Sequence, residues 1–221
     1  MMKKLICVLA AALTAASVCI AEGTISADDI VTFGHYEQDN DLTNGKEPIK
    51  WRVMEIVDGD AMLLSQSILD SKAYNDGHTK TSWSKSTLRA WLNSTFYDEA
   101  FDEDEKSKIV SKALETRYEP ETTTDPVTLL SCPDALRIFH SKEDRRGYAT
   151  PYALAQGVFV SKKYAPASHW WARNPSWEAY DKASYIAANG GVMKCGGPLE
   201  TPNYGVRPVI YVNVNDLTAD K

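Results

Sequence analysis

The sequence predicts an α+β fold, in which twisted antiparallel sheets pack with two or more short helices. Three observations support this. The runs at 49–57 and 61–68 are apolar and joined by an Asp-Gly turn, a strong local signal for a β-hairpin. The stretch 81–101 repeats large apolar side chains at helical spacing. The last third contains several short runs of β-branched and aromatic residues separated by glycine turns, which is typical of strands.

Composition limits the classes of partner. The chain has 221 residues, of which 43% are hydrophobic and 24% are charged, as expected of one folded soluble domain. The formal net charge is -6, and no cluster of Lys and Arg appears. Phosphate binding needs such a cluster, so the charge argues against nucleic-acid partners and against binding to anionic membrane surfaces.

The N-terminus predicts export. A short basic start is followed by the apolar run 5–20 and by Cys19-Ile20-Ala21, a small-x-small pattern for cleavage after Ala21. We therefore expect a signal peptide at 1–21, one domain at 22–221 with its core at about 30–214, and a secreted or cell-surface location. An uncleaved membrane anchor is the alternative, which the shortness of the apolar run disfavours.

Two cysteines, Cys132 and Cys195, lie outside the predicted signal peptide. In an exported chain they could form one disulfide, which by chain entropy would contribute about 4 kcal/mol. Two separate thiols are equally compatible with the sequence, because sequence does not fix the distance between them.

The stretch 81–101 is interpreted as a scaffold helix. Its apolar face points to a core, and Ser84 is its expected N-cap, because a short hydroxyl can accept from free backbone N–H groups of the first turn. The predicted hairpin presents Ile49, Trp51 and Val53 on one face, which we expect to pack on this helix. The helix face consists of Leu88, Trp91, Leu92 and Phe96.

Elements of the first half follow from local signals. The run 30–36 has strand composition, and the polar stretch 37–46 follows it. This stretch offers oxygen ligands of the kind calcium uses, yet its spacing misses the helix-loop-helix calcium pattern, so an ordinary acidic loop is expected. Asp102 and Glu105 predict a capping box for a helix at 103–111. The Pro- and Thr-rich stretch 119–126 predicts a flexible loop.

The second half contributes further short elements. A strand is predicted at 127–130, and short helices at 133–140 and 151–156, the latter ended by Gly157. Runs in the last third are interpreted as strands of one antiparallel sheet, with a loop at 174–181. These strands are predicted at 168–173, 184–187, 192–195 and 204–214.

No pattern in the sequence dictates a reaction. There is no Gly-x-Ser-x-Gly, and the four histidines lack zinc-ligand spacing. A total of 30 Asp and Glu makes chance carboxylate pairs inevitable, so they do not identify a glycosidase. We expect no catalytic residue, no cofactor and no metal. Arg173 and Arg207 are interpreted as structural guanidiniums buried beside Trp170 or Trp171.

Three separated groups of residues carry a resemblance. They are Phe33-Gly34-x-Tyr36 with Ile49-x-Trp51-Arg52-Val53; Trp83-x2-Ser86-x-Leu88-Arg89-x-Trp91-Leu92-Asn93; and Trp170-Trp171-x-Arg173 with Gly205-Val206-Arg207-Pro208. Together they resemble a family of exported bacterial domains of unknown function, over about 30–214. The resemblance brings no activity with it.

The final third is more distantly similar to the C-type-lectin-like fold of sulfatase-modifying domains. That likeness implies helices against a twisted sheet and a long loop region bearing any site. The calcium signature of sugar-binding members is absent, and Cys195 has no close cysteine partner of the kind the oxidases use.

The predicted function is a secreted, non-catalytic and monomeric binding module for a glycan, a peptide or a surface protein. The alternatives are a polysaccharide or cell-wall hydrolase with a carboxylate pair, and a purely structural domain. Recognition is expected on the loop 174–181 and the segment 196–204, unless Trp177 folds back onto the sheet. The candidate ligand-binding residues are Asn174, Trp177, Glu178, Tyr180, Asp181, Asn203 and Tyr204. The predicted structural residues are Trp51, Trp83, Leu88, Arg89, Trp91, Leu92, Trp170, Trp171, Arg173 and Arg207.

Overall fold

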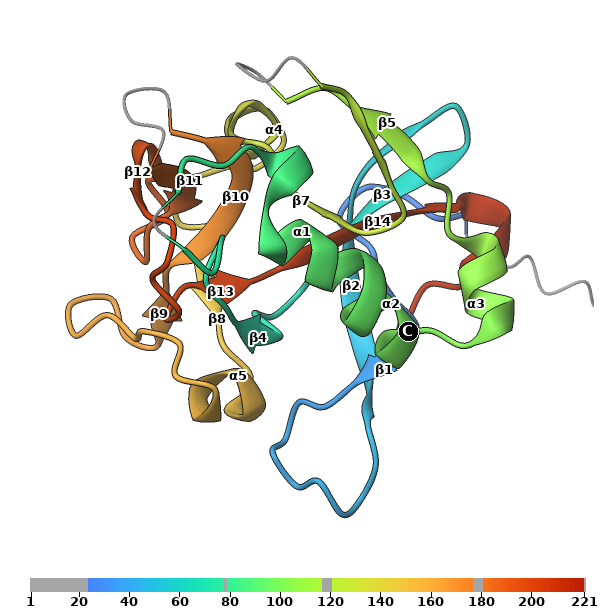
Figure 1. Cartoon of the computed structure of the whole chain (residues 1–221). Coiled ribbons are helices and arrows are strands. Elements are labelled where there is room, and N and C mark those ends of the chain that lie inside the picture. Colours follow the sequence, from blue (N-terminus) through green and yellow to red (C-terminus); the bar gives the residue numbers. More distant parts are fainter. Residues whose placement is uncertain (1–23, 78, 117–120, 177–180, 221) are drawn as a thin grey trace, which may run out of the picture.

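A computed structural model describes residues 24–77, 79–116, 121–176 and 181–220. In these ranges the chain forms sheets of mainly antiparallel strands and several short helices, which confirms the predicted α+β class (Figure 1). The predicted signal peptide lies outside the described residues. No helix in the described ranges combines the length and the apolar character needed to cross a membrane.

The first sheet contains the predicted hairpin. Its turn residues Asp58 and Gly59 have φ of 54° and 84°, the left-handed backbone that a two-residue hairpin turn requires. The last long strand of the chain pairs with the second strand of this hairpin. In spatial order the strands are β1 (Ile30–Tyr36), β2 (Glu47–Val57), β3 (Asp60–Ser65), β14 (Pro208–Asn213) and β7 (Thr128–Leu129).

The second sheet corrects one prediction. Its strand β13 ends at Val206, and β14 of the first sheet begins at Pro208, so the chain crosses between the sheets at Arg207. The last third therefore does not form one antiparallel sheet, and β13 even pairs with β10 in parallel. Proline at the first position of β14 suits this crossover, since a strand start tolerates its missing N–H. The strands in order are β12 (Val192–Pro198), β11 (Lys182–Ile186), β10 (Trp170–Pro175), β13 (Gly205–Val206) and β4 (Asp70–Ser71).

The predicted scaffold helix is present and differs in two details. Ser86, not Ser84, is its N-cap: the Ser86 hydroxyl accepts from the Arg89 N–H at 3.2 Å, whereas Ser84 lies in the preceding 3-10 turn. Trp91 is half-buried at the edge of the core rather than inside it, and Lys72 Nζ lies 4.6 Å from its ring centroid. The segments are η1 (Trp83–Lys85), α1 (Thr87–Trp91), the π-helical η2 (Leu92–Phe96) and α2 (Tyr97–Ala100).

The capping box predicted for the next helix is confirmed. Asp102 Oδ1 accepts from the Glu105 N–H at 2.8 Å, and Glu105 Oε2 accepts from the Asp102 N–H at 3.0 Å. Helix α3 (Glu103–Lys108) ends before the predicted Ser111, because Ile109 is extended and forms a bridge with Val212.

The remaining elements are short. The predicted flexible loop at 119–126 is wrong in part, because 123–125 forms a strand whose Thr123 and Asp125 are buried; residues 117–120 lie outside the described ranges. The elements are β5 (Lys112–Leu114), β6 (Thr123–Asp125), α4 (Cys132–Arg137), β8 (Gly147–Tyr148), α5 (Pro151–Ala155), β9 (Ala167–Ser168) and η3 (Val214–Asp216).

The sheets divide the core into two clusters. Successive side chains of a strand point to opposite faces, so Trp170 and Trp171 belong to different clusters although both are fully buried. Trp51 lies in the same cluster as Trp171 and as Leu92 of the scaffold helix. The hairpin face and the helix therefore share one core cluster, in which Phe101 contacts both Trp51 and Phe96.

Candidate functional site

The predicted ligand-binding residues fall into three groups. Trp177, Glu178 and Tyr180 lie outside the described residues. Asn174 is 6% exposed, and its Oδ1 accepts from the Cys132 N–H at 2.7 Å, so this side chain holds the start of α4 against β10 and does not face a ligand. The structure thereby corrects its assignment. The third group lies in the described part of the chain and reaches the surface: Asp181 is exposed, and Asn203 and Tyr204 are half-buried.

Asp181 and Asn203 are positioned through their backbones. Asp181 is exposed, and its carbonyl accepts from the Leu199 N–H at 3.2 Å beside the start of β11. Asn203 is half-buried, and its carbonyl accepts from the Phe159 N–H at 2.8 Å. The second bond ties the segment before β13 to the segment after α5, and so brings Phe159 next to Tyr204.

Tyr204 is part of a cluster of rings that we call the aromatic face. His169 is central in it: its ring lies 5.1 Å from that of Phe159 at an interplanar angle of 9°, and 5.7 Å from that of Tyr204. Tyr185 meets Tyr204 edge to face at 4.8 Å. These distances are typical of favourable aromatic pairs. The aromatic face consists of Phe159, His169, Tyr185 and Tyr204.

The second sheet explains why these rings gather. His169 directly precedes β10, Tyr185 lies in β11 and Tyr204 directly precedes β13, and these are neighbouring strands (Figure 1). The Gly205 N–H donates to the His169 carbonyl at 2.9 Å, which fixes the β13 end against the β10 end. Three of the rings are therefore mounted on one sheet.

A buried stack of rings supports the aromatic face from behind. Trp171 stacks on Tyr204 with centroids 4.1 Å apart, and its Nε1 donates to the Lys72 carbonyl at 2.8 Å. Tyr74 lies 5.6 Å behind Trp171, and Trp83 lies 6.1 Å behind Tyr74; all three are fully buried. Phe159, by contrast, is 41% exposed. The rings thus run from the core to the surface.

The polar groups of the aromatic face are uncharged. His169 Nδ1 accepts from the Ala188 N–H at 3.0 Å, which places the imidazole proton on Nε2, and burial lowers the pKa of His169. Burial also raises the pKa of Tyr185 and that of Tyr204. The face therefore combines neutral rings with hydroxyl and imidazole N–H groups.

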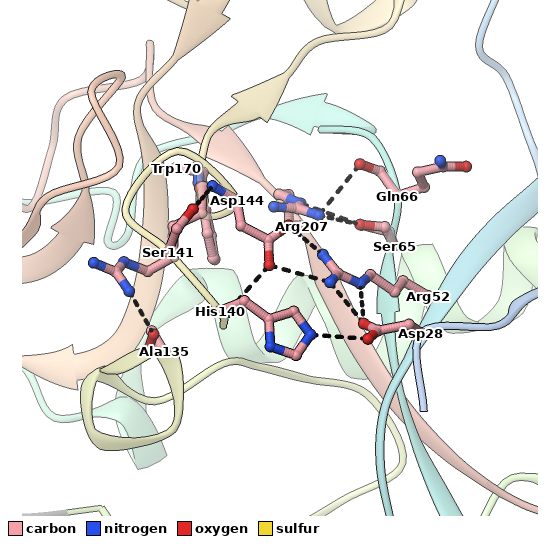
Figure 2. A network of polar contacts seen from close by, with 11 residues as sticks. Asp28, Arg52, Ser65, Gln66, Ala135, His140, Ser141, Asp144, Trp170 and Arg207 are labelled. Atoms are coloured by element: carbon pink, nitrogen blue, oxygen red, sulfur yellow. Dashed lines mark hydrogen bonds and ion pairs between the residues drawn. The ribbon is translucent and has the colours of Figure 1, made fainter. Parts of the chain in front are cut away.

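A second group of polar residues joins the first sheet to the segment after α4 through ion pairs and hydrogen bonds. Arg52 contacts Asp28 Oδ1 and Asp144 Oδ1, each at 2.6 Å, and His140 Nε2 lies 2.8 Å from Asp28 Oδ2 (Figure 2). The His140 hydrogen bond and Arg52 lower the pKa of Asp28, and Arg52 lowers that of Asp144. We interpret this network as structural.

Arg207 lies near this network, at the crossover between the sheets. Its guanidinium lies 4.8 Å from the Trp170 ring centroid, and its Nε and Nη2 donate to the Ser65 carbonyl at 3.1 and 2.9 Å (Figure 2). Burial lowers the pKa of Arg207 to about 9, and nearby Arg52 adds to this effect. Arg173, 5% exposed, donates to the Leu129 carbonyl at 3.1 Å. Both arginines therefore hold backbone segments together.

The two cysteines are free thiols in the structure. Cys132 is buried, which raises its pKa, and Cys195 is half-buried. Of the two possibilities that the sequence left open, the structure has two separate thiols and no disulfide between Cys132 and Cys195.

Sequence reasoning missed three of the four rings of the aromatic face. His169 could have been found, because His169 and Trp171 are two apart in a strand-like run and therefore point to the same side. For Tyr185 the sequence indicated only that the residue lies within a predicted strand, which does not show which face of the sheet its ring is on. No sequence pattern could have identified Phe159, because its position depends on the backbone hydrogen bond from its N–H to the distant Asn203 carbonyl.

These observations define the class of the protein: it is an α+β domain that carries an aromatic face beside its second sheet. A family model described as "Domain of unknown function (DUF6273)" matches residues 58–214. This match covers more than half of the chain, so the chain belongs to the DUF6273 family. No curated protein and no solved structure matches the chain. The predicted likeness to C-type lectins stays a prediction.

Proposed function

We propose that the chain is an exported, non-catalytic binding module that holds its ligand on the aromatic face. The ligand is a glycan, a peptide or a surface protein, and the chemistry of the face favours a glycan. A sugar ring has a flat C–H face that stacks on aromatic rings and hydroxyls that bond to polar groups beside them.

The observation that carries this proposal is the stack from Phe159 through His169 and Tyr204 to Trp171. The 41% exposed Phe159 ring stacks on His169, which is held at the end of β10, so it gives contact area at little cost in conformational entropy. The polar groups of the four rings are neutral, which suits an uncharged ligand. The His169 Nε2–H is a directional donor beside the rings.

The test is a glycan and peptide array probed with the purified protein and with Phe159→Ala. This variant should weaken binding to the ligand found by about tenfold or more, the effect of losing a buried aromatic anchor in an interface. Its midpoint of urea unfolding should stay close to that of the parent. Leu136→Ala is the matched control, because Leu136 is 48% exposed on α4, a helix that contributes no ring to the aromatic face, and should leave binding unchanged.

A second variant separates this face from the neighbouring loop. If the double variant Trp177→Ala/Tyr180→Ala abolishes binding while Phe159→Ala binds normally, the ligand occupies the loop 174–181 and the aromatic face is only structural. Normal binding by stable Phe159→Ala and Tyr204→Ala variants would contradict the proposal.

A further inference from the structure

Three carboxylates meet where the loop between β1 and β2 leaves the sheet. Glu37 directly follows β1, Asp39 lies two residues further on, and Glu47 is the first residue of β2. One carboxylate oxygen from each lies within 4.8 Å of the others. The loop they belong to protrudes from the body of the molecule (Figure 1).

Glu37 is the unusual member of this group. It is 7% exposed, and its Oε1 is buried without a hydrogen-bond partner among the described residues. A buried carboxylate oxygen with no partner is costly, so its position beside two other carboxylates calls for a bound cation.

The other two carboxylates are held in place by hydrogen bonds. Glu47 Oε2 accepts from the N–H groups of Gln38 and Asp39 at 2.6 and 3.1 Å. Asp39 Oδ1 accepts from the Asp41 N–H at 2.7 Å, and Asp39 Oδ2 accepts from Asn44 Nδ2 at 2.8 Å. Both side chains are therefore oriented before any ligand arrives.

No nearby cation neutralises these charges within the described part of the chain. Lys46 is adjacent to Glu47 in sequence, but its Nζ donates to the Glu99 carbonyl at 2.8 Å and lies 3.7 Å from the Glu99 carboxylate. No ion pair between described residues joins Glu37, Asp39 or Glu47 to Lys, Arg or His.

We propose that Glu37, Asp39 and Glu47 form a binding site for a divalent calcium ion. Ca²⁺ prefers oxygen ligands at about 2.3–2.6 Å, so oxygens on opposite sides of one ion lie up to about 5 Å apart, which accommodates the present separation. Mg²⁺ needs about 2.0–2.1 Å and near-ideal octahedral geometry, and it usually keeps several waters and takes only one or two carboxylates, so a site of three carboxylates favours Ca²⁺. Water would complete the coordination shell.

The base of the site is rigid enough for such a role. The Tyr152 N–H of α5 donates to the Gln38 carbonyl at 2.9 Å, and Gln38 Nε2 donates to the Glu47 and Pro48 carbonyls at 3.2 and 3.1 Å. Calcium bound here would neutralise the carboxylates and anchor the start of the protruding loop. The site could not be predicted from the spacing of these residues in the sequence, because Glu37 and Glu47 come together only when β1 pairs with β2.

Calorimetric titration of the EDTA-treated protein with CaCl₂ tests this inference. Binding should saturate at or below about 10 mM Ca²⁺, and Ca²⁺ should raise the midpoint of thermal unfolding. Glu37→Gln should weaken Ca²⁺ binding about tenfold or more. Without Ca²⁺ its unfolding midpoint should equal or exceed that of the parent, because the substitution removes a repelling charge.

Two further variants make the result decisive. Glu103→Gln is the matched control, because its parent side chain is 92% exposed, and this variant should bind Ca²⁺ as the parent does. Asp39→Asn replaces Glu37→Gln if that variant fails to fold, and it should lose Ca²⁺ binding likewise. The proposal is overturned if the folded parent shows neither heat nor a midpoint shift, if the site variants bind Ca²⁺ normally, or if Mg²⁺ binds as tightly as Ca²⁺.

Discussion

The ion pair between Arg89 and Asp125 should stabilise the junction between the scaffold helix and β6. Asp125 Oδ1 accepts from Arg89 Nε at 2.8 Å and lies 2.5 Å from Arg89 Nη2. Asp125 Oδ2 accepts from Trp83 Nε1 at 3.0 Å and from the Thr123 hydroxyl at 2.9 Å. The Asp125 side chain is fully buried, while that of Arg89 is 27% exposed. Replacing Arg89 therefore leaves a buried charge with only neutral donors.

The size of the effect follows from this burial. Removing one partner of a buried ion pair costs about 3–5 kcal/mol, because the remaining charge is uncompensated. Solvent near the partly exposed Arg89, together with the two neutral donors to Asp125, reduces this to about 2–4 kcal/mol for Arg89→Leu. Leucine is a strong helix former, so the substitution does not weaken α1 itself.

Urea unfolding of the parent, Arg89→Leu, Asp125→Asn and the double variant measures the coupling between the two side chains. The double variant should lose less than the sum of the single variants. Arg137→Leu is the matched control, because Arg137 pairs with Glu55 and Asp134 while 54% exposed, and it should cost at most about 1 kcal/mol. The reasoning is refuted if Arg89→Leu costs no more than this control.

Two further predictions follow from burial. Trp83→Ala should cost about 3–5 kcal/mol in urea unfolding and clearly more than Trp91→Ala, because Trp83 is fully buried whereas Trp91 is half-buried; equal losses would contradict the placement of Trp91. The lowered pKa of His169 predicts that the free energy of unfolding decreases as the pH falls below about 6.5, because the unfolded chain then binds a proton that the folded imidazole resists. His169→Gln should reduce this dependence between pH 7.5 and 5.5, and an unchanged slope would show that other groups cause it.

Features encoded by neighbouring residues were predictable from the sequence. The Asp58-Gly59 turn specified its hairpin, and Asp102 with Glu105 specified the start of α3, because the bonds involved span at most a few residues. Ser84 was the wrong cap because two serines two residues apart both qualify chemically. Only the 3-10 turn at Trp83–Lys85 decides between them.

Features that depend on distant segments were not predictable. The sequence 204–214 has uniform strand composition, yet Arg207 divides it between two sheets because its guanidinium binds the carbonyls of Ser65 and Gln66. Likewise Asn174 has the polarity of a binding residue but is committed to the Cys132 N–H across 42 positions. Tyr204 was predicted only as a candidate ligand-binding residue, and its ring partners His169, Trp171 and Tyr185 come from two other segments.

The adjacent tryptophans link the core to the proposed binding face. Trp170 packs against Arg207 on one side of β10, and Trp171 stacks on Tyr204 on the other side. Two adjacent residues therefore stabilise both the crossover between the sheets and the aromatic face. All four rings of that face lie within the 58–214 range of the family match, whereas the proposed calcium site at 37–47 lies before it. The aromatic face therefore lies in the part of the chain that matches the family, whereas the proposed calcium site lies in the β1–β2 loop outside the matched range. Variants at the two sites should consequently act independently, with Glu37→Gln leaving ligand binding intact and Phe159→Ala leaving Ca²⁺ binding intact.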